Sequence, residues 1–262
     1  MARNTRRTPA PNPTEELTQL AIDLDLTTLA HNLPTLLERA ETDSPSFTDF
    51  GLKMFRAEVS ARKTRRLERS LKRSRLGAVE GLDGFDFAVR SKLDPRVVKE
   101  LAGCRFVAEH RNVLCLGRAG LGKTRIAKAI AHAACLADYS VLCVRAEEMI
   151  EELRASHADD TFKRAFRRYV KPQLLLLDEF GYEPFSAEAT NHLFRLVSAR
   201  HRQGSIVLTA NTGFSKWRAL FPSEATAVAT VDRLVDYATI LRFTGKSFRQ
   251  PHRIVGAPLE ND

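Results

Sequence analysis

The chain has 262 residues, of which 44% are hydrophobic and 28% charged, enough for one large domain or for a core domain with an appendage. No apolar stretch approaches the roughly 18 residues that a membrane helix needs, and no apolar segment follows the basic amino-terminal arm. We therefore expect a cytoplasmic protein without a membrane span or secretory signal. Four cysteines without a C-x-x-C pair and seven scattered histidines favour reduced thiols and argue against a zinc site.

The net charge of +9 is concentrated in one segment. Residues 51–76 contain ten lysines and arginines against two acids, Glu58 and Glu68, so this segment alone carries a charge of +8. Such asymmetry indicates a polyanionic partner, nucleic acid before membrane.

The amino-terminal third of the chain predicts helices. Residues 1–13, with three prolines and three arginines, are typical of a disordered basic arm. Residues 14–76 predict a helical DNA- or partner-binding domain, in which we expect Pro34 to kink or break the leucine-rich helical stretch LTTLAHNLPTLLERAE. Ser46 and Asp49 have capping-box spacing and predict the start of the next helix, which runs to about Leu76. The glycine-rich residues 77–93 predict a linker.

Short apolar runs then alternate with amphipathic stretches of helix length. Asp94 and Pro95 predict a capped helix start, and the predicted strands are NVLCLG, SVLCVR, LLLLDEF, SIVLTAN and TILRF. This alternation predicts an α/β fold over residues 94–250, with an open parallel five-stranded sheet flanked by helices. Residues 251–262 predict a flexible tail.

The stretch GRAGLGKT, residues 117–124, has the spacing of a phosphate-binding P-loop and lies between a predicted strand and a predicted helix. Its glycines let successive N–H groups point at phosphate oxygens, and the following helix start favours the same anion. Lys123 is expected to reach the β- and γ-phosphates, and Thr124 to hold magnesium. The predicted nucleotide-binding residues are Gly117, Arg118, Ala119, Gly120, Leu121, Gly122, Lys123, Thr124 and Arg125.

Two further strands end in polar residues. Asp178 and Glu179 close LLLLDEF, at the sheet edge where ligands bind in parallel α/β folds. We expect Asp178 to share the magnesium with Thr124, and Glu179 to polarise the attacking water. Asn211 closes SIVLTAN and either reaches the γ-phosphate and its water or is an ordinary turn residue.

These stretches together resemble a known family. GLGKT, LLLLDEFGYEPF, GSIVLTANTGFSKW, VDRLVDYATILRFTGKSFR and the upstream GFDF resemble the IstB group of AAA+ ATPases, over residues 15–250. That group comprises helpers of a bacterial insertion-sequence transposase and is related to DnaC-type helicase loaders. The resemblance implies ATP and Mg2+ as ligands and a central P-loop strand. Because the chain stops soon after GKSFR, we expect no carboxy-terminal helical lid of the kind found in larger AAA+ proteins.

The resemblance also implies roles for single residues. Asn211 would be the sensor, and Arg233 would reach the γ-phosphate of a neighbouring subunit; a surface pair with Asp232 is the competing interpretation of Arg233. A second sensor role for Arg249 stays open. Arg118, Ala119 and Arg125 depart from the family's usual Gly-Pro-Pro and His, which leaves nucleotide affinity and base preference open.

Basic residues of the helix predicted within residues 51–76 form an arc on one side of it. Such an arc would neutralise several phosphates of double-stranded DNA without reading its sequence, unless it is simply a solvated charged face. On a helical wheel six residues fall within about a third of the circumference, namely Arg62, Arg65, Arg66, Arg69, Lys72 and Arg73.

The sequence thus predicts an ATP-dependent, DNA-binding AAA+ ATPase that forms homo-oligomers on DNA and presents target DNA to a partner transposase. A helicase loader shares this ATPase core and differs in its partner. A small-molecule P-loop kinase and a non-hydrolysing nucleotide-gated scaffold are two further hypotheses, and Glu179 argues against the scaffold.

Overall fold

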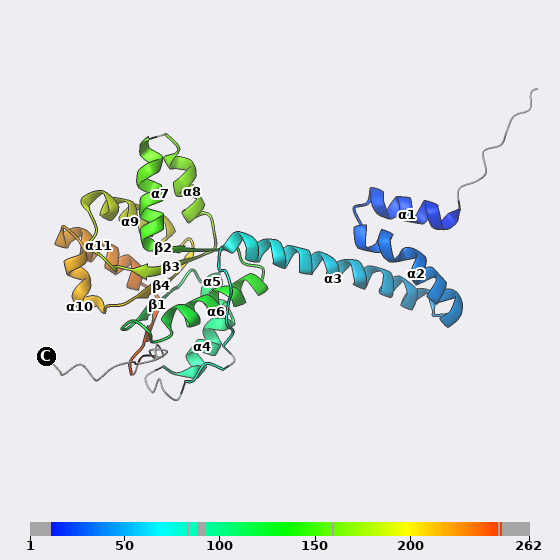
Figure 1. The fold of residues 1–262 in the computed structure, drawn as a ribbon, viewed down its shortest axis with the longest axis horizontal. Coiled ribbons are helices and arrows are strands. Elements are labelled where there is room, and N and C mark those ends of the chain that lie inside the picture. Colours follow the sequence, from blue (N-terminus) through cyan, green and yellow to red (C-terminus); the bar gives the residue numbers. More distant parts are fainter. Residues whose placement is uncertain (1–11, 83, 88–92, 159, 246, 248–262) are drawn as a thin grey trace, which may run out of the picture. The chain divides into compact units, whose positions relative to one another are not determined.

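The computed structural model describes residues 12–82, 84–87, 93–158, 160–245 and 247, and forms two compact units that meet between Glu68 and Arg69 (Figure 1). The boundary falls inside helix α3 (Phe47–Ser74). Most of the expected arm, the whole expected tail and Arg249 lie outside the described residues. Among the residues that are described, no helix is both long enough and apolar enough to cross a membrane.

The first unit consists of α1 (Pro13–Asp23), α2 (Thr27–Asp43) and the beginning of α3. Ala21, Leu29, Ala30 and Leu33 form its small buried core. The expected break at Pro34 is wrong, because α2 continues through this residue as one helix. The proline removes one backbone hydrogen bond, and the buried turn just before it holds the helix against the core.

The predicted cap of α3 is confirmed at Ser46. The backbone N–H of Asp49 donates to Ser46 Oγ at 3.1 Å, and the Ser46 hydroxyl donates to the Asp49 carboxylate at 2.7 Å. One of the orphan N–H donors of the first turn thereby finds an acceptor.

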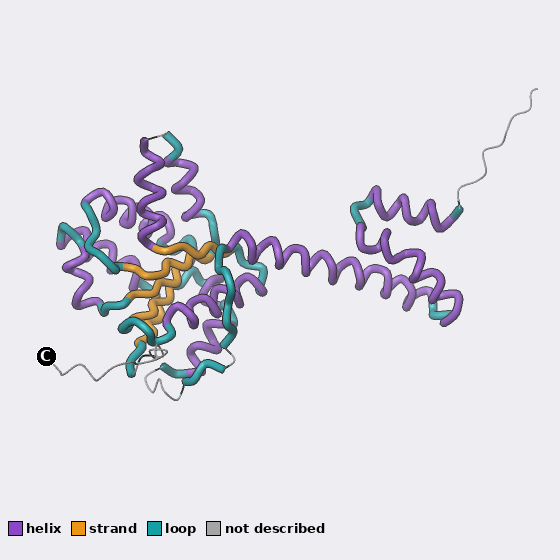
Figure 2. The backbone as a smooth tube through the Cα atoms, in the orientation of Figure 1, coloured by secondary structure: helices purple, strands orange, loops and turns teal. Residues whose placement is uncertain are grey.

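The second unit contains the predicted parallel sheet (Figure 2). Its strands are β1 (Asn112–Leu116), β2 (Val141–Arg145), β3 (Leu174–Phe180), β4 (Ser205–Ala210) and β5 (Ala238–Arg242). Every neighbouring pair is parallel, in the order β2-β3-β4-β1-β5. All five predicted strands are confirmed. The P-loop strand β1 is an interior strand between β4 and β5.

Helices cover both faces of this sheet. One face carries α6 (Lys123–Leu136), on which α4 (Pro95–Ala102) packs, with the short α5 (Arg105–Ala108) next to α4. Asp94 caps α4 as predicted, since its carboxylate accepts the N–H of Arg96 at 2.8 Å. The other face carries α7 (Ala146–Ala158), α8 (Phe162–Val170), α9 (Ala187–Arg200) and α11 (Glu224–Val235). The short α10 (Phe214–Trp217) and the 3-10 turn Arg218–Leu220 precede α11.

Buried side chains alternate between the two faces of the sheet, as the pleat requires. Leu114, Leu175, Leu177 and Leu208 lie in the core beneath the helices of the second face. The four cysteines are buried free thiols, in agreement with the expectation from their spacing. Burial raises the pKa of Cys115, at the centre of β1, to about 12, which keeps this thiol protonated and unreactive at neutral pH.

A buried arginine joins two connections of the sheet. Arg200, at the end of α9, is 1% exposed, and burial lowers its pKa to about 10, so it stays charged at neutral pH. Its guanidinium donates to five carbonyl oxygens, those of Tyr169, Val170, Pro172, Gln173 and Ser205. These bonds hold the α8–β3 connection against the start of β4.

Candidate nucleotide-binding site

The P-loop begins where β1 ends. Gly117, Gly120 and Gly122 have φ angles of +155°, +76° and +87°, which L-residues with a side chain rarely adopt. At Gly117 a Cβ would lie 2.2 Å from the carbonyl oxygen of Phe243, the residue that follows β5. The loop therefore needs glycine at its first position both for its conformation and for the close approach of a neighbouring chain segment.

Lys123, the first residue of α6, points back into the loop. It is only 6% exposed, and its ammonium donates to the carbonyl oxygen of Arg118 at 2.8 Å and to Asn211 Oδ1 at 2.9 Å. Asn211 follows β4, the strand beside β1. The structure thus brings together the P-loop lysine and the predicted sensor, from positions 88 residues apart.

Thr124 and Asp178 also meet. The Thr124 hydroxyl donates to Asp178 Oδ1 at 2.9 Å, so a hydroxyl and a carboxylate oxygen lie adjacent at the carboxyl end of the sheet. Both are hard oxygen ligands of the kind that magnesium takes together with water and phosphate oxygens. The two residues therefore fit the predicted magnesium site.

Glu179 owes its position to a bulge in β3. Leu177 pairs with Leu208 and Phe180 pairs with Ala210, so Asp178 and Glu179 together oppose the single residue Thr209. Glu179 has a φ of +56°, a conformation that is costly for a residue other than glycine. The bulge leaves the Glu179 side chain exposed and lining the nucleotide cavity, while its neighbours in the strand are buried.

Thr209 holds this bulge and was not predicted from the sequence. Its hydroxyl donates to Asp178 Oδ1 at 2.5 Å. The Thr209 hydroxyl oxygen also accepts the backbone N–H of Glu179 at 3.0 Å. The available signal was a hydroxyl residue two positions before Asn211, on the strand next to the Asp-Glu strand.

A cavity of about 880 Å³ lies beside these residues, and its lining includes Lys123, Thr124, Glu179, Thr209 and Asn211 but not Asp178. This volume suits a nucleotide-sized ligand. Besides the residues from Ala119 to Arg125, the lining includes Arg145 at the end of β2, Glu147 in the first turn of α7, Glu179 and Tyr182 from β3 and its turn, Thr209, Asn211, and the upstream residues Glu80, Gly84, Phe85 and Asp86. Gly117 and Arg118 lie at the start of the loop and do not belong to the lining.

Two arginines contribute charge to this cavity. Arg125 pairs with Glu80 at 3.1 Å, and its guanidinium carbon lies 5.7 Å from the centre of the Phe85 ring, so it holds the upstream segment at the cavity. Arg145, opposite Asp178 in the β2–β3 register, pairs with Glu148 at 2.5 Å. Arg145 was not predicted as a site residue, although it ends a predicted strand on the same sheet edge.

Arg233 lies elsewhere, near the end of α11. Its guanidinium donates to the carbonyl oxygen of Ala229 at 2.9 Å and lies over the ring of Phe194, 4.9 Å from its centre. It lines a separate pocket of about 500 Å³ with His201, Asp232, Val235 and Asp236. Within the described part of the chain, the ion pairs include none between Asp232 and Arg233.

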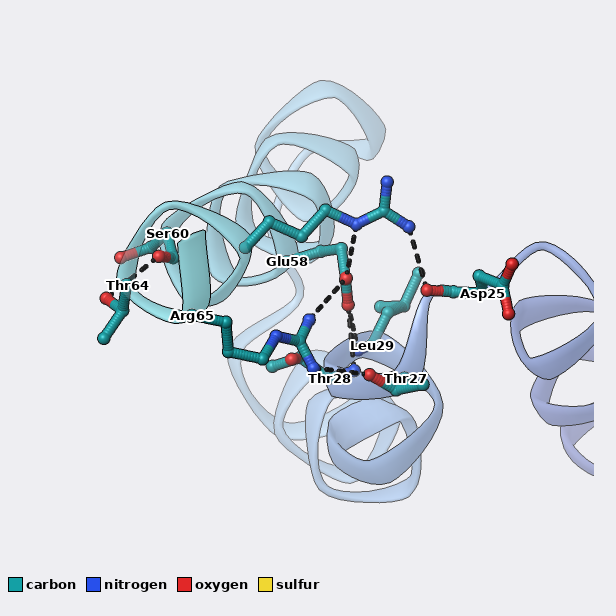
Figure 3. A network of polar contacts seen from close by, with 9 residues as sticks. Asp25, Thr27, Thr28, Leu29, Glu58, Ser60, Thr64 and Arg65 are labelled. Atoms are coloured by element: carbon teal, nitrogen blue, oxygen red, sulfur yellow. Dashed lines mark hydrogen bonds and ion pairs between the residues drawn. The ribbon is translucent and has the colours of Figure 1, made fainter. Parts of the chain in front are cut away.

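All six residues of the predicted basic arc are exposed. Two of them have a local task in the first unit (Figure 3). Glu58 of α3 is buried, and its carboxylate accepts the N–H groups of Thr28 and Leu29 at the start of α2, each at 2.9 Å. Arg62 and Arg65 pair with the same carboxylate at 2.9 and 3.2 Å, while their side chains stay 51% and 44% exposed.

These contacts extend to the α1–α2 turn, where Arg62 donates to the carbonyl of Asp25 and Arg65 to the hydroxyl of Thr27. Burial alone would raise the pKa of Glu58, but the hydrogen bonds from Leu29, Arg62 and Thr28 outweigh it and keep this pKa below its ordinary value.

A second basic surface lies on α8 and was also not predicted. This helix, FKRAFRRYV, buries Tyr169 and exposes Lys163, Arg164 and Arg167. The sequence signal was a short helix with basic residues on the face opposite its aromatic residues.

Comparison with known proteins identifies a matching family and two similar relatives. Residues 18–255 match the family described as IstB-like ATP binding protein. The chain is 34% identical over 234 residues to an ATP-binding protein of insertion sequence IS21 from Pseudomonas aeruginosa, covering 89% of this chain and 88% of that relative. It is 29% identical over 226 residues to an ATP-binding protein of insertion sequence IS5376 from Geobacillus stearothermophilus, covering 86% and 90%.

Among solved structures, the DnaC helicase loader is similar with a TM-score of 0.51 and 14% identity, covering 67% of this chain and 99% of that one. At this identity the likeness concerns the fold alone, a parallel α/β domain.

Proposed function

Because the chain belongs to the IstB-like ATP-binding protein family, we propose that it is a magnesium-dependent ATPase that oligomerises on double-stranded DNA and presents this DNA to a partner transposase. One observation carries the proposal: Lys123, Thr124, Asp178, Glu179 and Asn211, which come from the P-loop and from the ends of two neighbouring strands, converge at one site. The names of the relatives, ATP-binding proteins of insertion sequences, support the link to transposition.

In the proposed reaction each residue has a separate task. Lys123 exchanges its contacts with the Arg118 carbonyl and Asn211 for oxygens of the β- and γ-phosphates. Asn211 is thereby released to hydrogen-bond the γ-phosphate or the attacking water. Glu179 accepts a proton from that water. Magnesium, held through Thr124 and Asp178, neutralises charge on the phosphates when it is bound.

DNA binding is assigned to exposed basic residues. We assign the salt-dependent affinity to the six exposed residues of the basic arc, and Arg62 and Arg65 contribute to it in addition to their pairing with the buried Glu58. The basic face of α8 offers further phosphate contacts in the ATPase unit. Contacts of this kind hold DNA without reading its sequence.

Arg233 is assigned to the active site of a neighbouring subunit. It lines a pocket other than the nucleotide cavity of its own chain, and a guanidinium at the γ-phosphate is worth a factor of about a thousand or more in rate. An oligomer on DNA would therefore complete each site with the arginine of the next subunit.

The test compares ATP turnover with and without DNA in the wild type and in two variants. Glu179→Gln should keep ATP binding but lower turnover by about two orders of magnitude or more, whereas Lys123→Ala should weaken binding itself. DNA-stimulated turnover without any small acceptor would support the ATPase assignment over a kinase. Wild-type turnover in Glu179→Gln, or absence of stimulation by DNA, would contradict the proposal.

Recruitment of a transposase is tested by electron microscopy of the protein on DNA with a non-hydrolysable ATP analogue, followed by addition of the transposase from the same insertion sequence. Ordered oligomers that retain the transposase support the proposal, and isolated monomers contradict it.

A further inference from the structure

A buried amide connects the nucleotide-binding strand to the helix that carries Arg233. Asn112 is the first residue of β1 and is 7% exposed. Its Oδ1 accepts the backbone N–H of Ile206, in β4, at 2.9 Å. Its Nδ2 donates to the carbonyl oxygen of Leu234, in the last turn of α11, at 3.0 Å. One side chain therefore satisfies a donor and an acceptor of two elements that are separate in the sequence.

The elements joined by Asn112 carry the working parts of the proposed ATPase. The other end of β1 continues into the P-loop, and the other end of β4 carries Thr209 and Asn211. Leu234 directly follows Arg233 in α11. The position of this last turn is thus fixed against the two strands that support the γ-phosphate site.

Asp236 makes a second set of contacts, here called the outer tie, which fixes the end of α11 to the segment before β4. Asp236, which follows α11, accepts from His201 Nε2 at 2.7 Å and pairs with Arg202 at 3.2 Å. Both partners lie in the turn between α9 and β4. Arg202 also lies over the ring of Tyr237, 4.9 Å from its centre. The end of α11 is therefore anchored to the segment that leads into β4 as well as to the sheet.

The guanidinium of Arg233 contacts its own helix α11 and the neighbouring helix α9, so the direction of the side chain follows the position of these helices. Its guanidinium donates to a carbonyl one turn earlier in α11 and lies against Phe194 of α9, which packs on α11. These contacts would be kept if α9 and α11 moved together relative to the sheet, whereas the hydrogen bond from Asn112 joins α11 to the sheet itself.

We propose that Asn112 is a positioning residue for Arg233: the amide fixes the last turn of α11 against β1 and β4, and the outward reach of Arg233 depends on it. The inference rests on the proposed action of Arg233 on a neighbouring subunit. A displacement of about 1 Å in a catalytic group costs up to about a hundredfold in rate, so loss of the amide should be visible in turnover.

Mixed assemblies on DNA provide the test. A Lys123→Ala subunit has no functional nucleotide site but can donate Arg233, and an Arg233→Ala subunit has a site but no arginine to donate. Asn112→Leu is placed either in the first or in the second subunit. We expect turnover of the mixture to fall about tenfold or more when Asn112→Leu is in the Lys123→Ala subunit, which donates Arg233. Turnover should change less than about twofold when Asn112→Leu is in the Arg233→Ala subunit, which supplies the nucleotide site.

A merely structural role of Asn112 would lower turnover equally in both arrangements, and this result, or no loss in either, would overturn the inference. Asp236→Ala, at the outer tie, repeats the comparison with a less buried residue if Asn112→Leu does not fold. Gln173→Leu is the control at an exposed side chain, because Gln173 joins the starts of β2 and β3 through Ser140 and its side chain does not bond to α11. It should leave both arrangements within about twofold.

The parental mixture distinguishes a failure of the role of Arg233 from a failure of the role of Asn112. If Lys123→Ala and Arg233→Ala fail to restore turnover although they assemble together on DNA, the proposed role of Arg233 is wrong and the inference falls with it. If they restore turnover and Asn112→Leu acts equally in both subunits, only the inference is wrong.

Discussion

The Thr209 hydroxyl donates its hydrogen to Asp178 Oδ1 at 2.5 Å, and the Thr209 hydroxyl oxygen accepts the backbone N–H of Glu179 at 3.0 Å. One hydroxyl thereby orients the proposed magnesium ligand and stabilises the bulge that turns Glu179 into the cavity. Without it, the left-handed conformation of Glu179 would lose its hydrogen-bonded support.

We therefore expect Thr209→Val, which keeps the shape and removes the hydroxyl, to lower kcat by about ten- to a hundredfold. ATP affinity should change much less, because Lys123 and the P-loop are untouched. Steady-state kinetics and a direct binding titration separate the two effects. Thr209→Ser restores the hydroxyl and should recover most of the activity; an equally inactive Thr209→Ser would contradict the role of the hydroxyl.

The second prediction concerns DNA. Replacing Arg66, Arg69 and Arg73 with Gln should weaken binding to any duplex sequence and reduce the slope of log affinity against log salt by up to about 2.7, or about 0.9 per lost phosphate contact. Glu58 keeps its partners in this variant, because Arg62 and Arg65 are unchanged.

The matched control for the DNA prediction replaces three exposed basic residues of the second unit with Gln, namely Lys99, Arg105 and Lys216. It removes the same charge and should leave the salt slope nearly unchanged. Equal slopes in the two triple variants would show that the arc merely faces solvent.

The third prediction concerns Glu58. Glu58→Ala leaves two backbone N–H groups at the start of α2 without an acceptor, which should cost about 1–3 kcal/mol of local stability. Hydrogen exchange of the Thr28 and Leu29 amides in the full chain measures this loss. Glu68→Ala, which removes an exposed carboxylate from the same helix, is the control and should leave both amides protected.

The same carboxylate makes the first unit sensitive to acid. Because the pKa of Glu58 is lower in the folded chain than in the unfolded chain, its ionised form stabilises the fold. This contribution is complete above the ordinary glutamate pKa of about 4.3 and is lost as the pH falls through the lower, folded value. Protection of the two amides, corrected for intrinsic exchange, should therefore decrease below about pH 4 in the wild type. It should be independent of pH there in Glu58→Ala.

The fold could be predicted largely because its strands are buried on both faces and appear as short apolar runs such as LLLLDEF. The P-loop could be predicted because its glycines and Lys123 have a local spacing that the chemistry of phosphate binding demands. Thr209 and Arg145 were missed because their importance comes from the register between neighbouring strands, which no single segment encodes. Glu58 looked like one acid in a basic run, and only the packing of α2 on α3 gives it a buried task.

The last prediction concerns the segment upstream of α4. Arg125 pairs with Glu80 at 3.1 Å and lies 5.7 Å from the Phe85 ring, and all three residues line the nucleotide cavity. The pair therefore holds the upstream segment where it can slow the escape of a bound nucleotide. The Glu80 side chain is 75% exposed, so the contribution is that of a surface ion pair.

Reversing one charge should expose this role. Glu80→Arg places two arginines together and should speed release of a fluorescent ATP analogue about two- to fivefold in stopped-flow measurements. Arg125→Glu should do the same by pairing two acids, and it also removes the contact with Phe85. The double reversal restores an ion pair with opposite polarity, so its release rate should return toward that of the wild type. Glu109→Arg, which changes a residue outside the lining of this cavity, controls for the change in net charge. Release rates that multiply in the double variant, instead of recovering, would show that Glu80 and Arg125 act independently.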